Sequence, residues 1–162
     1  MITMSSHQPL GVARPPADRP AALTRAFREY TDELHWTVVV RPPAVELRLQ
    51  ATMRAVAVRA GVGCEVASLL WAAAPLGPVV AVPCGTLVLW AFLAADDPGD
   101  PYPVVPFGAK LLSRDRTLPL PPTRSRHGEV RWVSRPAADA PRLPRLSLLL
   151  AAIRATQRPR RW

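Results

Sequence analysis

Carboxylate side chains are the first groups to consider, because paired Asp or Glu residues hold metal ions or transfer protons in many active sites. Glu46 lies alone in an alternating segment, and Arg48 shares its face, so the two are predicted to form an exposed ion pair. Three aspartates lie in the proline-rich residues 94–108: Asp96, Asp97 and Asp100. That segment offers no rigid element to hold a metal. The sequence therefore predicts no catalytic residue, no metal site and no cofactor.

Histidine and cysteine give no ligand cluster either. His127 neighbours Glu129 and is predicted to face solvent. The two cysteines, Cys64 and Cys84, lack a Cys-x-x-Cys spacing, which argues against a structural zinc site. Both are predicted to be small buried apolar side chains in a reducing cytoplasm.

A glycine pair, Gly61 and Gly63, follows a predicted strand and opens a predicted helix, as in dinucleotide-binding loops. The third glycine of that motif is replaced by Val66, and the next strand ends at Pro83 and Cys84 without an acidic residue for a ribose. The glycines are therefore predicted simply to turn the chain.

Positive charge is concentrated in one part of the chain. Residues 1–99 contain eight arginines and eight carboxylates, whereas residues 100–162 contain thirteen Lys or Arg against four carboxylates. This asymmetry favours a surface that faces a polyanion. The alternative is the codon bias of a GC-rich bacterial genome, because Lys110 is the only lysine and asparagine is absent. The candidate nucleic-acid-binding residues are Arg114, Arg116, Arg124, Arg126 and Arg131.

The basic segment LPLPPTRSRHGEVRWV, residues 118–133, joins two short apolar runs. Alternation predicts a strand at each end, and Pro121 and Pro122 end the first because proline cannot donate to a strand ladder. Gly128 permits the return, so a hairpin or a strand–loop–strand unit is expected. Trp132 is predicted to be buried and to help close the sheet over the final helix.

The hydrophobic periodicity predicts an α+β fold with a single mixed or mostly antiparallel sheet and about three packing helices. Residues 1–19 are predicted to be a flexible N-terminal arm and residues 20–162 a single domain. Asp18 is expected to cap the first helix, and Pro144 to lie in the first turn of the last. The helices are expected near 20–34, 64–73 and 143–157, and the strands near 36–40, 45–49, 55–58, 78–82, 87–93 and 110–112.

Residues 66–95 carry no charge, which raises the question of a membrane span. Prolines and glycines divide them into a helix and two strands, each too short to cross about 30 Å of hydrocarbon as a helix. We expect these residues to form core, with no membrane partner, in a cytoplasmic protein.

Three segments follow one another along the chain: PLGPVVAVPCGTLVLWAFLA (75–94), LPLPPTRSRHGEVRWVSRP (118–136) and the predicted helix LPRLSLLLAAI after them. Together they resemble the N-terminal prim-pol domain of bifunctional DNA primase/polymerases. In that family a strand ends in a Pro-x-Gly turn, and a later strand ends in Pro-Pro before a basic loop and a strand carrying Trp. The order agrees over residues 20–157, including a first helix that ends at an aromatic residue such as Trp36.

The resemblance implies a nucleotidyl-transfer site, from which this chain departs. Polymerases of that family hold two metals with acidic residues two positions apart on a strand, and carry a histidine after the Pro-x-Gly turn. Here Glu46 is flanked at those positions by Ala44 and Arg48, and residues 86–89 contain no histidine. The resemblance therefore implies a prim-pol-like domain with a degenerate active site.

The leading hypothesis is a non-catalytic, prim-pol-like cytoplasmic protein. It would bind nucleic acid weakly and without sequence specificity, or a protein partner, through its arginine-rich C-terminal half. Two alternatives stay open. One is an active DNA primase/polymerase whose metals are held by Glu46 with Asp96 or Asp97, and the other is a pure protein-interaction domain.

Overall fold

The fold is that of a computed structural model, which describes residues 18–50, 52–73, 76–99, 103–137 and 142–158. Its helices are α1 (Arg19–Arg28), continued by the π-helical turn η1 (Glu29–Glu33), α2 (Ala60–Ala73) and α3 (Leu146–Thr156). Its strands are β1 (Val38–Arg41), β2 (Ala44–Arg48), β3 (Met53–Arg59), β4 (Val79–Cys84), β5 (Leu87–Ala95), β6 (Lys110–Leu111), β7 (Thr117–Leu120), β8 (Arg124–Ser125), β9 (Gly128–Glu129) and β10 (Arg131–Ser134).

Within the described residues the strands form three sheets with antiparallel pairing between neighbours. The strand orders are β1-β2-β7, β10-β4-β5-β3-β6 and β8-β9. The α+β class is therefore confirmed, but the predicted single sheet is divided. Pro121 and Pro122 end β7, because neither can donate to a continuing ladder. The chain leaves the three-stranded sheet after β7 and joins the five-stranded sheet only at β10.

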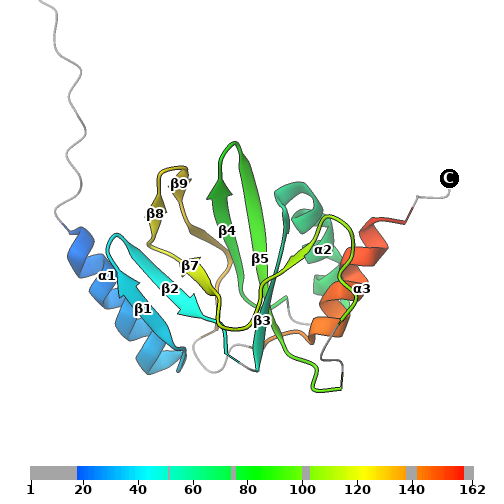
Figure 1. Ribbon diagram of the computed structural model, residues 1–162, viewed down its shortest axis with the longest axis horizontal. Coiled ribbons are helices and arrows are strands. Elements are labelled where there is room, and N and C mark those ends of the chain that lie inside the picture. Colours follow the sequence, from blue (N-terminus) through cyan, green and yellow to red (C-terminus); the bar gives the residue numbers. More distant parts are fainter. Residues whose placement is uncertain (1–17, 51, 74–75, 100–102, 138–141, 159–162) are drawn as a thin grey trace, which may run out of the picture.

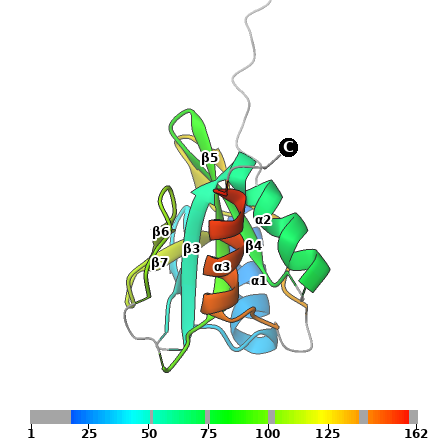
Figure 2. The same ribbon diagram turned by 90° about the vertical axis from the view of Figure 1, so that its right-hand side faces the viewer.

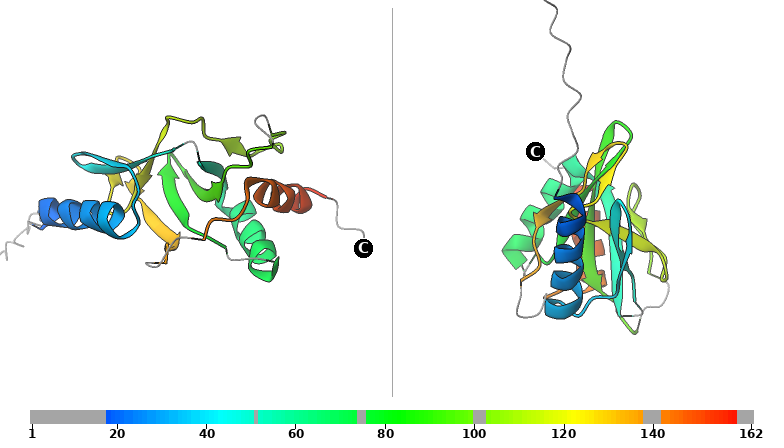
Figure 3. Two further views of the ribbon diagram at one scale, coloured as in Figure 1. Left: turned by 90° about the horizontal axis from the view of Figure 1, so that it is seen from below. Right: turned by 90° about the vertical axis from the view of Figure 1, so that its left-hand side faces the viewer.

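The helices cover two different surfaces. Figure 1 shows α1 at one end of the molecule, against β1 and β2, and α3 at the other end. Figure 2 shows α2 and α3 side by side over one face of the five-stranded sheet. Figure 3, seen from below, shows the sheets between these helical layers. One apolar core lies between α1 and the two large sheets, and a second lies under α2 and α3.

The apolar spacing decides which face of each helix is buried. In the first helical segment the apolar spacing predicts a stripe of Leu23, Ala26, Phe27, Tyr30 and Leu34. Four of these are buried, but Phe27 is 37% exposed, which corrects the prediction at that position. In α3 the predicted stripe is confirmed in full: Leu146, Leu149, Leu150 and Ile153 are buried. Asp18 occupies the N-cap position of α1, although its side chain makes no capping hydrogen bond.

Two predicted helix starts are wrong. β3 is followed directly by α2, so Gly61 and Gly63 lie inside the helix and do not form the predicted turn between strand and helix. Gly63 has a packing reason instead, because a Cβ there would lie 2.7 Å from the ring of Trp90. Pro144 lies before α3, in an extended segment where its carbonyl accepts a hydrogen bond from the Ala95 N–H (2.8 Å).

Both cysteines are exposed, which corrects their predicted burial. Cys64 lies on α2 one residue after buried Gly63 and two before buried Val66, so it falls on the solvent side of that helix. Cys84 ends β4 at the tip of the β4–β5 hairpin, beyond the core. Apolar neighbours in the sequence do not decide burial at either position.

The uncharged residues 66–95 contribute to both cores. Val80 and Ala91 are buried in the core beneath α1, and Val66, Leu70 and Phe92 in the core under α2 and α3. No helix in the described part of the chain is long and apolar enough to cross a membrane. Residues 1–17 of the predicted N-terminal arm lie outside the described residues, and Arg19 is the first residue of α1.

Candidate nucleic-acid interface

The turn at residues 121–123, which precedes the basic hairpin of residues 124–131, is anchored on two sides. The Tyr30 hydroxyl donates a hydrogen bond to the Pro121 carbonyl (2.6 Å), which ties the turn to the first helical segment. Burial raises the pKa of Tyr30 to about 12, so this hydroxyl stays protonated at neutral pH. The Thr123 hydroxyl accepts from the Val45 N–H (2.8 Å) and donates to the Val45 carbonyl (3.0 Å). The turn is therefore fixed to both η1 and β2.

The basic hairpin, residues 124–131, follows this turn. Arg124 pairs with Glu129 and Ser125 with Gly128 in the two-stranded ladder of β8 and β9. Gly128 has a φ of 135°, a conformation that glycine tolerates best. The Ser125 hydroxyl accepts from the His127 N–H (3.1 Å) and donates to the Gly128 carbonyl (3.2 Å), which closes the turn.

One carboxylate serves two arginines of the hairpin. Arg124 forms an ion pair with one oxygen of Glu129, and Arg131 with the other (3.3 Å). Hydrogen bonds from Arg124 and then Arg131 hold the pKa of the Glu129 carboxyl below its ordinary value. Arg126 has a different partner: its Nε donates to Nε2 of His127 (2.9 Å). His127 is exposed, as predicted. With three arginines and one glutamate, the hairpin keeps an excess of positive charge.

The hairpin lies beside the projecting β4–β5 hairpin (Figure 1). A Cβ on Gly128 would lie 3.3 Å from the ring of Pro83 near the end of β4. On the other side of this pair of strands, Arg59 ends β3 opposite Leu89 of β5. Arg59 is exposed and was not among the predicted contacts, because its half of the sequence is electrically neutral. Only the strand order brings it to the same end of the sheet.

Arg114 and Arg116 are not part of the basic hairpin. Both precede β7, whereas Arg124 follows that strand, so the five predicted arginines lie in two groups at opposite ends of β7. Arg114 forms an ion pair with Asp96, and the Arg116 carbonyl accepts from the Leu49 N–H (3.0 Å). The ion pair gives the Arg114 side chain a structural role that charge alone does not predict, whereas the Arg116 contact involves its backbone only.

The carboxylates of the metal-binding alternative have separate roles. Asp96 is 7% exposed and pairs with Arg54 (3.4 Å) as well as with Arg114. Asp97 accepts a hydrogen bond from the Ser147 N–H (2.7 Å) and so caps α3. Among the described side chains no group of three His, Cys, Asp or Glu residues could hold a metal ion. Asp100 lies outside the described residues.

Glu46 belongs to the three-stranded sheet, between Val39 of β1 and Pro119 of β7. The predicted exposed ion pair with Arg48 is wrong: it is not among the ion pairs of the described residues, and Oε2 of Glu46 is buried without a hydrogen-bond partner there. The neighbouring strands half-bury the carboxylate, while Arg48 at the end of β2 extends into solvent.

Trp132 packs near the first helical segment, which corrects the predicted contact with the final helix. Its ring lies 6.2 Å from that of Tyr30 and 6.4 Å from that of Trp36, between centroids. The reason is register: Trp132 pairs with Val80, which belongs to the core under α1. Trp132 is half-buried, and its Nε1 is buried without a hydrogen bond of good geometry among the described residues.

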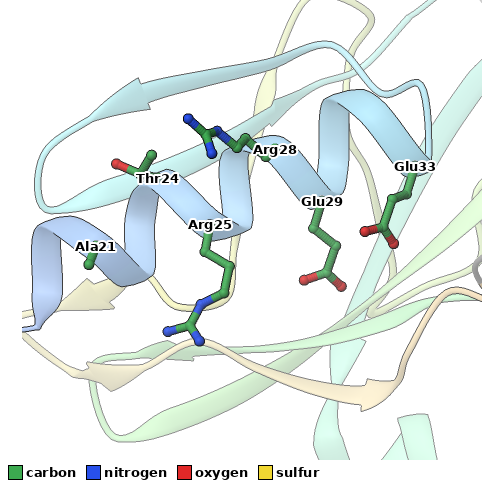
Figure 4. A pocket seen from close by; sticks show the side chains of 6 residues that line it. All are labelled: Ala21, Thr24, Arg25, Arg28, Glu29 and Glu33. Atoms are coloured by element: carbon green, nitrogen blue, oxygen red, sulfur yellow. The ribbon is translucent and has the colours of Figure 1, made fainter.

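A groove of about 540 Å³ runs along α1 and η1 (Figure 4). Two arginines and two glutamates line it, together with Ala21 and Thr24: Arg25, Arg28, Glu29 and Glu33. Glu29 also pairs with Arg135 (2.9 Å). Because the two arginines are balanced by the two glutamates, the groove has no excess charge with which to attract a polyanion.

Neither family models, nor curated proteins, nor solved structures give a match to this chain.

Proposed function

We propose that this chain is a non-catalytic, prim-pol-like protein that binds nucleic acid through the basic hairpin, without reading its sequence. One observation carries the proposal: an anchored hairpin carries three guanidinium groups and a single carboxylate, Glu129, which pairs with only two of them. Phosphate contacts from arginine supply affinity and a strong salt dependence, but no information about base sequence. We further propose that the protein acts in the cytoplasm.

The support is electrostatic and geometric. Arg126 engages only its neighbour His127 in the described structure, so its guanidinium can turn to a phosphate at the loss of one exposed hydrogen bond. Arg124 and Arg131 can each exchange the shared Glu129 for a phosphate, which accepts bidentate hydrogen bonds from arginine. Arg59, on the other side of the β4–β5 hairpin, extends the same basic end of the molecule.

Binding is tested with fluorescently labelled single- and double-stranded DNA of arbitrary sequence, by anisotropy at two salt concentrations. The double variant Arg124→Gln and Arg126→Gln is expected to bind more weakly and to lower the salt slope by about one to two. Its melting temperature is expected to stay close to that of the wild type, because exposed substitutions change stability by about 0.5 kcal/mol or less.

The matched control is Arg25→Gln with Arg28→Gln in the groove of α1, which removes the same charge from outside the hairpin. Equal weakening by both double variants would mean that net charge, and not the hairpin, attracts the DNA. A third variant, Glu129→Gln, frees two guanidinium groups and is expected to strengthen binding. No measurable binding by the wild type at low salt would remove the proposal.

The non-catalytic part of the proposal has its own test. With a primed template, nucleotides and magnesium or manganese, the purified protein is expected neither to extend nor to synthesise a primer. The metal-binding alternative needs Asp96 or Asp97 beside Glu46, and these two aspartates are engaged by Arg54, Arg114 and the start of α3. Extension that is lost in Glu46→Ala would overturn this part and favour an active primase/polymerase.

A further inference from the structure

The tip of the β4–β5 hairpin, residues 84–88, exposes apolar side chains away from the core. Every residue of the tip is exposed, and the hairpin projects beyond the neighbouring strands (Figure 1). Leu87 is 46% exposed and Val88 43% exposed, and neither belongs to the two cores formed by the described residues. The tip contains no charged residue. It is therefore a small apolar projection that the fold itself does not use.

A short turn holds the tip in one conformation. Cys84 pairs with Leu87, so only Gly85 and Thr86 join the two strands. Gly85 has a φ of 61°, which tight hairpin turns commonly require and which glycine adopts without strain. Such a turn has little backbone freedom to lose when the tip contacts a ligand, so the entropic cost of that contact is low.

Arginines flank the tip on both sides. On the β4 side, a Cβ on Gly128 of the basic hairpin would lie 3.3 Å from the ring of Pro83, and Pro83 pairs with Val88. On the β5 side, exposed Arg59 lies opposite Leu89, the residue that follows the tip. The apolar tip therefore stands between two basic groups, the arginines of the basic hairpin and Arg59.

We infer that the tip inserts among unstacked bases, so that single-stranded nucleic acid is the preferred ligand of this end of the molecule. The inference rests on the proposed function, because it needs the arginines to hold phosphates. A strand whose phosphates contact both basic groups passes over the tip, where its bases cover Leu87 and Val88. In a duplex the same contact requires base pairs to unstack, whereas the bases of a single strand are accessible.

The chemistry of the tip favours bases over an anionic lipid surface, which also presents phosphates. Leu87 and Val88 together offer fewer apolar carbons than one myristoyl chain, which alone gives only marginal membrane binding. The tip also lacks Trp and Tyr, the residues that are enriched where proteins meet the membrane interface. Apolar side chains such as leucine, by contrast, are the ones that insert between base steps.

The test compares three labelled ligands of equal length by fluorescence anisotropy at one salt concentration. They are oligothymidylate, the duplex that it forms with oligoadenylate, and a strand with the same backbone but no bases. The duplex has the highest charge density, so phosphate contacts alone would favour it. The wild type is expected to bind oligothymidylate more tightly than the duplex, and about tenfold more tightly than the strand without bases.

Two variants remove the apolar surface of the tip: Leu87→Gln, and Leu87→Gln with Val88→Thr. Binding to oligothymidylate is expected to weaken about fivefold in the first and about tenfold in the second, because half-exposed side chains lose their burial against bases. Binding to the duplex and to the strand without bases is expected to stay as in the wild type. Leu69→Gln is the matched control, since Leu69 is 44% exposed on α2, and it is expected to bind like the wild type. Melting temperatures check that all three variants fold.

The two exposed cysteines give an independent readout on the wild type. Cys84 lies in the tip, whereas Cys64 lies on α2. Saturating oligothymidylate is expected to slow the alkylation of Cys84 by iodoacetamide severalfold and to leave that of Cys64 unchanged, as measured by mass spectrometry. Equal alkylation of Cys84 with and without the DNA would contradict the placement of bases over the tip.

Failure of this inference and failure of the proposed function give different results. If the arginines of the basic hairpin were needed for binding, but the tip variants bound oligothymidylate like the wild type, the inference would be overturned and the proposed function would stand. No binding of the wild type to any of the three ligands would remove both. Vesicles that contain phosphatidylserine and bind the wild type but not the double variant, with DNA binding unaffected by the tip, would assign the tip to a membrane surface and overturn the inference.

Discussion

Replacing Thr123 by valine tests whether one hydroxyl holds the turn before the basic hairpin. Thr123 is 4% exposed, and its hydroxyl accepts from the N–H of Val45 and donates to the carbonyl of Val45. The carbonyl of Leu120, the register partner of Val45, accepts from the Thr123 N–H instead (3.0 Å). The hydroxyl therefore takes the place of a backbone group at the end of the β2–β7 ladder.

Valine has nearly the shape of threonine but cannot form either hydrogen bond. The buried N–H of Val45 would be left without this acceptor, at a cost of about 1–3 kcal/mol, and its carbonyl would lose a bond worth about 1 kcal/mol. The extra buried methyl group returns at most about 0.8 kcal/mol. The free energy of unfolding is thus expected to fall by about 1–3 kcal/mol, and Tm by about 3–10 °C.

Thr123→Ser is the matched control, because it keeps the hydroxyl and removes only a methyl group, at about 1 kcal/mol. Urea unfolding, followed by circular dichroism, is expected to rank the wild type above Thr123→Ser and Thr123→Ser above Thr123→Val. Hydrogen exchange at the Val45 amide should quicken in Thr123→Val alone. If the valine variant proved as stable as the serine variant, apolar burial and not the hydroxyl would hold the turn, and the reasoning would be refuted.

Three further substitutions test the packing described above. Gly61→Ala, where a Cβ meets open space in α2, is expected to raise the free energy of unfolding by about 0.5–1 kcal/mol. Gly63→Ala is expected to lower the free energy of unfolding by about 1–3 kcal/mol, because the added Cβ would collide with the ring of Trp90. If Gly61→Ala and Gly63→Ala changed this free energy equally in parallel urea titrations, the contact with Trp90 would be contradicted. Trp132→Ala is expected to cost about 3 kcal/mol while Trp132→Phe recovers part of the loss, as measured by Tm. Burial raises the pKa of Tyr30 from 10.0 to about 12, so the stability it contributes is complete below pH 10 and is lost as the pH rises from 10 to 12. Unfolding measured between pH 9 and 12 should show this loss of stability in the wild type. If a Tyr30→Phe variant lost as much stability over the same pH range, the loss would have to come from another group.

Local pattern was sufficient for most elements of the fold. Alternation in β2 and the apolar stripe of α3 depend on neighbours in the sequence, and both predictions are confirmed. The division into separate sheets was missed because it depends on contacts that local pattern does not contain. The hydroxyl of Thr123 reaches Val45, 78 residues away, and no periodicity records such a bond.

The candidate site shows the same limit. The five arginines were chosen by charge alone, and charge does not show that β7 separates Arg114 and Arg116 from the other three. Nor does it show that Asp96 engages Arg114, or that Arg59 reaches the basic end through the order of strands. A carboxylate in the sequence suggests a metal ligand, whereas in the structure Asp97 caps a helix 50 residues away.

The anchoring of the turn bears on how the hairpin would bind. Binding through long side chains loses affinity when a flexible loop must first be ordered. Here Tyr30 and Thr123 fix the backbone just before Arg124, and the Ser125 hydroxyl closes the turn at Arg126. Only the arginine side chains then lose freedom when phosphates bind. A Thr123 variant that still folds should therefore bind DNA more weakly than the wild type, although its arginines are all intact, because the hairpin that carries them would no longer be held in place.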